Sequence, residues 1–260
     1  MSLLQSASRS AAFLLGHLRT QPTVPWFSSS VRKPLISTEE AIDALSVARF
    51  GDVGLHRDTN YLSNLIIPGA MKHAWLHTHD VEDTTGRNKG YIVDATSVGV
   101  CSSHALTKFI SDYAILLRPR GVTDKQRKGA CLKAGNIVGA SYDITFNFDI
   151  EHELKFYKAE DEEDKQEAVD SLLLSAESLK KYNYAFSCSE VVAYSWWHCR
   201  KELQISRRKW LGKDVILPID FMHSGFEIVW CSESWTVDIA RQQGLGEQAL
   251  DMLVDWKYKG

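Results

Sequence analysis

The sequence lacks the features that would place it in a membrane or on a nucleic acid. Its 260 residues contain no run of about 18 or more uncharged apolar side chains, so no membrane-spanning helix is expected. Lysine and arginine together number 30, against 33 aspartates and glutamates, and the net charge is -3. This balance gives no general attraction to phosphate groups, so we expect no nucleic-acid partner.

The cysteines lack the pattern of a disulfide framework or a zinc ribbon. There are five of them, an odd number, at wide spacings and with no C-x-x-C pair. His77 and His79 offer one local alternative, because two imidazoles at this spacing can share an ion. No third ligand is indicated, so we expect no metal and no cofactor.

The N-terminal region lacks acidic residues before Glu39, while it is rich in serine and carries several basic residues. This composition is similar to that of an organelle transit peptide, and the alternative is an arm that packs on the body or on a protein partner. We therefore divide the chain into such a segment at 1–36 and a domain at 37–260. The location in the cell stays open: the cytoplasm or a particle suits an arm, and an organelle suits a transit peptide.

The composition of the rest is that of a globular domain, with 44% hydrophobic and 24% charged residues. The patterns of apolar residues show no regular alternation of strands and helices, so the predicted class is α+β. An acidic insertion is expected near 149–182, as a solvated segment. Strands are expected at 51–57, 72–78, 91–93, 97–100, 113–117, 142–148, 215–219 and 226–230, and helices at 41–45, 105–109, 123–138, 187–203 and 245–256.

Cys188 stands at the predicted start of a buried helix. Ser187 and Glu190 form an S-x-x-E capping box just before an apolar run, which makes Cys188 the first helical residue. The unpaired N–H groups and the positive end of the helix dipole favour a thiolate there, and the thiolate is the reactive form. The alternative is that the box caps an ordinary core helix and Cys188 only packs.

A base and a group that orients it can be chosen from the neighbouring strands. His73 begins a predicted strand, which places it well to face a helix N-terminus across a cleft. Asp94 ends the strand expected to pair with it, so that its carboxylate could fix one tautomer of the imidazole. The alternative is that Asp94 is a strand-end turn residue, and Asp52 or a backbone carbonyl is then the next candidate.

Several short motifs in a fixed order resemble the permuted papain-like hydrolases, a group that includes bacterial YiiX-like proteins and their poxvirus relatives within the NlpC-type cell-wall amidase superfamily. The resemblance spans roughly residues 50–230. It is carried by Gly51-Asp52, His73-Ala74, Val93-Asp94-Ala95, Gly99-Val100, Gly139-Ala140-Ser141-Tyr142-Asp143 with Phe146, Phe186-Ser187-Cys188-Ser189-Glu190-Val191-Val192 and Leu217-Pro218-Ile219-Asp220.

The resemblance implies a circularly permuted papain-like fold, in which the helix with the cysteine packs on an antiparallel sheet that carries the histidine. It implies that Cys188 is the nucleophile and His73 the base. Asp94 occupies the position where the family usually has glutamate, which is longer by one methylene. Tyr142 resembles a tyrosine near the oxyanion site of non-permuted members, although it lies far from Cys188 in the sequence.

The function expected from these residues is a cysteine-dependent hydrolase that cleaves an amide or ester bond through a thioacyl intermediate. Its substrate would be a peptide, a cell-wall peptide or a lipid-like acyl compound. One alternative is a structural or binding protein with little turnover, such as a component of a virus or phage particle. Another is a lipid acyltransferase.

Overall fold

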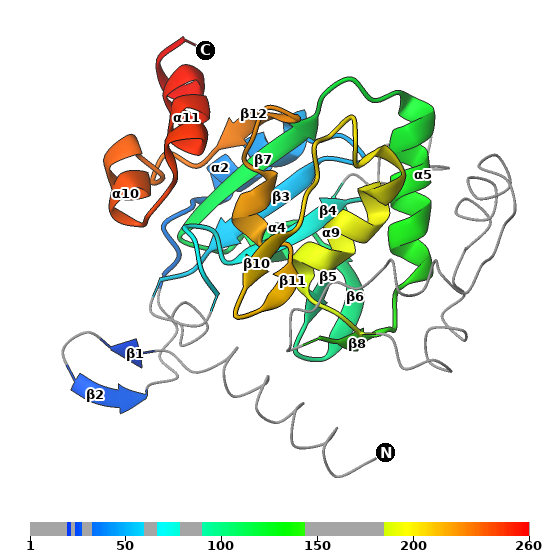
Figure 1. Cartoon of the computed structure of the whole chain (residues 1–260). Helices are drawn as coiled ribbons and strands as arrows, with labels where there is room; N and C mark the ends of the chain where they lie inside the picture. The colour runs from blue at the N-terminus through cyan, green and yellow to red at the C-terminus, as the bar shows by residue number, and fades with distance from the viewer. Residues whose placement is uncertain are drawn as a thin grey trace, which may run out of the picture.

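A six-stranded antiparallel sheet forms the centre of the protein (Figure 1). The computed structural model describes residues 20–21, 24–27, 33–59, 67–78, 90–143 and 185–259. The order across the sheet is β12-β7-β3-β4-β5-β6, which with its helices confirms the α+β class. The strands are β3 (Val53–Arg57), β4 (His73–His77), β5 (Tyr91–Thr96), β6 (Gly99–His104), β7 (Tyr113–Pro119) and β12 (Phe226–Cys231).

Two helices, α5 (Asp124–Asn136) and α9 (Cys188–Trp196), lie side by side over one face of the sheet (Figure 1). Alternate strand residues such as Leu55 and Leu76 point to this face and form the larger core with apolar residues of both helices. Because α9 packs directly on β4 and β5, its first turn lies close to the strands that carry His73 and Asp94.

The opposite face of the sheet is covered by α2 (Thr38–Val47) and α4 (Leu106–Phe109), which build a second core around Trp75. The Phe109 ring packs edge-on against Trp75 at 5.7 Å and against Trp230 at 5.3 Å between ring centroids. Gly54 pairs with Trp75 across β3 and β4, and a Cβ there would overlap the indole ring. The large ring therefore needs glycine opposite it.

Two sequence-predicted elements differ from the structure after Cys188. The predicted strand at 215–219 is wrong beyond Val215: β11 (Lys213–Val215) pairs with β10 (Arg208–Trp210), and Pro218–Phe221 forms the 3-10 helix η2. Pro218 has no N–H to donate to a strand partner, and the Asp220 carboxylate accepts a hydrogen bond from the Leu217 N–H at 2.8 Å.

The predicted helix at 187–203 ends early, at Trp196. A 3-10 turn, η1 (Trp197–Cys199), follows it, and the Ile205 N–H then binds the Arg200 carbonyl at 2.8 Å. At the end of the chain, α11 (Glu247–Lys259) corresponds to the helix predicted at 245–256. The helix α10 (Val237–Gln242) was not predicted, and both lie beyond β12 in Figure 1.

Several sequence-based expectations fall outside the described residues. They are most of the N-terminal segment 1–36, the predicted strand beyond 143, and the acidic insertion at 149–182. In the described part of segment 1–36, the strands are β1 (Thr20–Gln21) and β2 (Val24–Phe27). Within the part of the chain that the structure describes, no helix is both long and apolar enough to cross a membrane.

Candidate active site

The capping box predicted before Cys188 forms in the structure. Ser187 has the extended backbone angles of an N-cap, with φ -78° and ψ 170°, and its N–H donates to Glu190 Oε2 at 2.6 Å. Cys188 is the first residue of α9 and is buried. The Ser189 hydroxyl also donates to the Ile216 carbonyl at 2.5 Å, which fixes the start of the helix against the segment before η2.

His73 is held between Asp94 and Cys188. Strands β4 and β5 pair as expected, and His73 Nε2 lies 2.6 Å from Asp94 Oδ2. The Asp94 side chain is fully buried, while that of His73 is 19% exposed. The Cys188 side chain forms a hydrogen bond with the same imidazole. Since Asp94 occupies Nε2, the nitrogen left for the sulfur is Nδ1.

The charges in this group favour a protonated imidazole. Burial by itself lowers the pKa of His73, but the charge of Cys188 and the hydrogen bonds to Asp94 and Cys188 raise it to about 9. Burial acts to raise the pKa of Asp94, yet the His73 hydrogen bond and the charges of His73 and Lys108 hold it well below its usual range. At neutral pH an imidazolium therefore lies between a carboxylate and the sulfur.

Tyr142 reaches the same region through a short parallel ladder. Strand β8 (Ser141–Tyr142) pairs with β9 (Ala185–Phe186), and Tyr142 lies opposite Phe186, two residues before Cys188. Burial raises the pKa of Tyr142, and the charges of Cys188 and Glu190 add to the rise. The phenol therefore stays protonated and can donate a hydrogen bond.

Two further groups near His73 were missed by sequence reasoning. Lys108 on α4 places Nζ 2.5 Å from Asp94 Oδ2. The His56 ring lies 4.7 Å from that of His73, and burial, with the charges of His73 and Lys108, lowers the pKa of His56 well below its usual range. No motif identifies either residue. For His56, the sequence predicts only that it lies in a strand at 51–57, and the pairing of that strand with β4 brings it beside His73.

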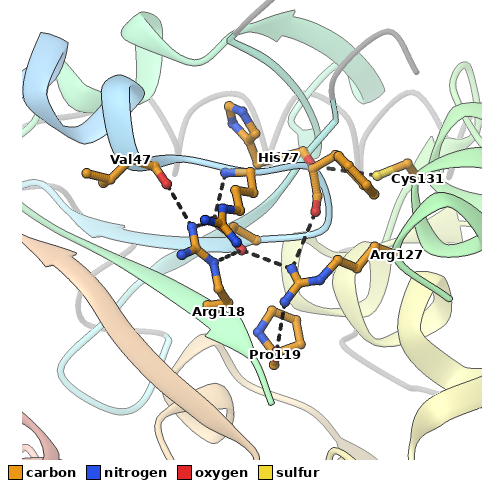
Figure 2. A network of polar contacts seen from close by, with 9 residues as sticks. Val47, His77, Arg118, Pro119, Arg127 and Cys131 are labelled. Atoms are coloured by element: carbon orange, nitrogen blue, oxygen red, sulfur yellow. Dashed lines mark hydrogen bonds and ion pairs between the residues drawn. The ribbon is translucent and has the colours of Figure 1, made fainter. Parts of the chain in front are cut away.

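Asp52, the alternative to Asp94, belongs to a separate ion-pair network. Arg118 Nη2 lies 2.7 Å from Asp52 Oδ2, and Arg127 Nη1 lies 3.2 Å from Asp52 Oδ1. Figure 2 shows the two guanidinium groups side by side, with Arg118 also bonded to the Val47 carbonyl at 2.7 Å and Arg127 to that of Pro119 at 2.9 Å. The Gly51-Asp52 motif therefore has a structural role in this chain.

Burial disfavours the thiolate at three of the other cysteines. Burial raises the pKa of Cys131 and that of Cys231 to about 12, and also raises the pKa of Cys101. Such thiols are poor nucleophiles. His77 is buried, and His79 lies outside the described residues. Over the described part of the chain, no group of three or more His, Cys, Asp or Glu side chains is placed to hold a metal ion.

Comparison with known proteins adds no relative to this picture. No protein-family model, no curated protein and no solved structure matches the chain. The functional argument therefore depends on the geometry of the site itself.

Proposed function

We propose that the protein is a thiol hydrolase that cleaves an amide or ester bond through a thioacyl intermediate on Cys188. The observation that carries this proposal is the position of His73, which hydrogen-bonds both Asp94 and Cys188, with Cys188 at the start of α9. A nucleophile, a base and a group that orients the base are the parts that covalent catalysis needs.

The reaction proceeds in two steps. The Cys188 thiolate attacks the substrate carbonyl carbon, a carbon–sulfur bond forms, and the carbon–nitrogen or carbon–oxygen bond breaks as the His73 imidazolium gives its proton to the leaving group. A water molecule then attacks the thioester while neutral His73 takes up its proton. The carbon–sulfur bond breaks, and the acid, the thiolate and the imidazolium are restored.

The negative oxygen of each tetrahedral intermediate needs hydrogen-bond donors. We assign the Cys188 backbone N–H, one of the unpaired N–H groups at the start of α9, as the first donor. The Tyr142 hydroxyl is the second, because its strand pairs beside Phe186 and its phenol stays protonated. Both donors come from the segments that meet at β8 and β9.

We also propose that the fold is a permuted papain-like fold. It is supported by the chain order, in which the strand with His73 precedes the helix with Cys188, and by the packing of that helix on an antiparallel sheet. Asp94 stands where the family usually has glutamate, and its carboxylate still reaches His73 Nε2 at 2.6 Å. We keep the substrate class as a peptide, a cell-wall peptide or a lipid-like acyl compound.

The test is reaction with p-nitrophenyl acetate, followed by mass spectrometry of the intact and digested protein. We expect an initial burst and an acetyl group on Cys188, both lost in Cys188→Ala and His73→Ala. Cys231→Ala, which removes a buried thiol on β12, is the matched control and should keep the burst. A folded protein that gives no adduct, or an adduct on another cysteine, would contradict the proposal and leave the binding protein as the better function.

A further inference from the structure

Lys108, which is not one of the three proposed catalytic residues, forms an ion pair with the same Asp94 carboxylate that binds His73. Lys108 Nζ lies 2.5 Å from Asp94 Oδ2, and His73 Nε2 lies 2.6 Å from the same oxygen. The Asp94 side chain is fully buried and that of Lys108 is 15% exposed. One buried oxygen thus binds two nitrogen donors, which is closer coupling than a surface ion pair provides.

The backbone of α4 places Lys108 firmly. Ala105 and Phe109, on either side of it, are buried in the second core, and Phe109 packs against Trp75 of β4. The Ala105 N–H also donates to the Gly90 carbonyl, directly before β5. Lys108 is therefore tied to the two strands that carry His73 and Asp94.

The groups that interact with the His73 imidazole come from several elements. The interactions with Asp94 and Cys188 favour the imidazolium, whereas the charge of Lys108 disfavours it. His56 is neutral at neutral pH, because its pKa is lowered well below its usual range. Among the described residues, the titratable groups around His73 and its carboxylate are His56 (β3), Asp94 (β5), Cys101 (β6), Lys108 (α4), Tyr142 (β8) and Cys188 (α9).

We propose that Lys108 is a positioning residue that holds Asp94 ionised and oriented and limits how strongly Asp94 retains the His73 proton. This inference rests on the proposed function, in which the His73 imidazolium must give the proton on Nδ1, the nitrogen left for Cys188, to the leaving group. An imidazolium stabilised by a buried carboxylate is a weak general acid at neutral pH. A cation on the shared oxygen draws charge away from the imidazole and makes the proton easier to transfer.

The experiment is an NMR titration of carbon-labelled histidine in the full chain, with the His73 signal assigned from His73→Gln. In Lys108→Met we expect the His73 midpoint to rise by about one pH unit, because a neighbouring positive charge is lost. The alkaline limb of p-nitrophenyl acetate hydrolysis should move in the same direction. Lys108→Arg, which keeps the charge, should restore the original midpoint, and Lys125→Met, at an exposed position on α5, should leave it unchanged.

An unchanged or lower midpoint in folded Lys108→Met would overturn the proposal, and so would an Arg variant that titrates like the Met variant. If Lys108→Met does not fold, Lys108→Gln provides the same loss of charge with a polar group kept at Asp94. The titration needs no turnover. If the wild-type protein hydrolyses nothing but the His73 midpoint still rises in Lys108→Met, the proposed hydrolase is contradicted. The electrostatic role of Lys108 is then supported.

Discussion

The carboxylate of Asp94 decides how His73 is oriented, because it binds the nitrogen that faces away from Cys188. Asp94→Asn keeps the size of the side chain but removes its charge, and the two donors on Oδ2 lose their anionic partner. We expect kcat/KM for p-nitrophenyl acetate to fall about 10- to 100-fold, or about 1.4 to 2.7 kcal/mol of transition-state stabilisation. The thiolate–imidazolium pair can form without the carboxylate, so the loss should stay smaller than that of Cys188→Ala.

Full activity in Asp94→Asn would show that the third position belongs to another group. The activities are compared only in a variant that unfolds at a urea concentration close to that of the wild type, since Asp94 is buried and bonded to Lys108 as well.

Glu190 combines a structural contact with an unusual charge state. Burial, with the charge of Asp143, raises its pKa to about 8 from an ordinary value of 4.5. The folded protein therefore binds a proton that the unfolded chain has released, so this residue's contribution to stability falls as pH rises from 4.5 to about 8. Glu190→Gln keeps an oxygen for the Ser187 N–H and removes the ionisation.

We expect Glu190→Gln to lose less stability than the wild type between about pH 5 and about pH 8, measured as the change in free energy of urea unfolding. Glu190→Ala separates the two roles, because it removes the ionisation and the cap together. Parallel pH profiles of wild type and Glu190→Gln would contradict the raised pKa.

At the scale of elements, the starts of helices could be predicted from the sequence better than their ends. The S-x-x-E pattern at Ser187 places the start of α9 correctly, since a cap is a local contact between side chain and backbone. Its end at Trp196 depends on how the following turn packs, which no local pattern records. The same limit explains η2, where the predicted strand continued into Pro218.

The pairing of β3 with β4 depends on the small size of Gly54. We expect Gly54→Ala to lower the free energy of unfolding by about 1 to 3 kcal/mol, because the added methyl overlaps the Trp75 ring in a packed core. Gly135→Ala is the matched control: its Cβ would meet no atom within 4 Å, and it lies near the end of α5. That change should be neutral or stabilise by up to about 1 kcal/mol.

Urea unfolding of both glycine variants measures the difference. Equal stability of the two would mean that β4 can shift away from β3 without cost.

At the scale of the whole molecule, the candidate site is made of segments far apart in the sequence. His73, Asp94 and Cys188 could be predicted as a group because each sits in a short motif. Lys108 could not, because nothing in its own sequence records that α4 packs against Trp75 of β4 and Asp94 of β5. Tyr142 is expected near the site only from the family resemblance, and the pairing of β8 with β9 brings it beside Phe186.

The buried ion pairs of Asp52, the residue before β3, connect it to Arg118 of β7 and Arg127 of α5 (Figure 2). Asp52→Asn leaves Arg118 and Arg127 without their anionic partner. We expect a loss of about 3 kcal/mol in the free energy of unfolding, as for other broken buried pairs. Asp238→Asn makes the same chemical change at an exposed pair with Arg241, where the side chain is 85% exposed, and should leave stability unchanged.

The same variant separates the structural carboxylate of Asp52 from that of Asp94, which is proposed to orient His73. Because Asp52 is bound by two arginines and makes no contact with His73 in the described structure, folded Asp52→Asn should hydrolyse p-nitrophenyl acetate at close to the wild-type rate. Rates are compared at a temperature where urea unfolding shows the variant to be folded. A loss of turnover as large as that of Asp94→Asn, in protein that is still folded, would mean that the Asp52 network also sets the geometry of His73.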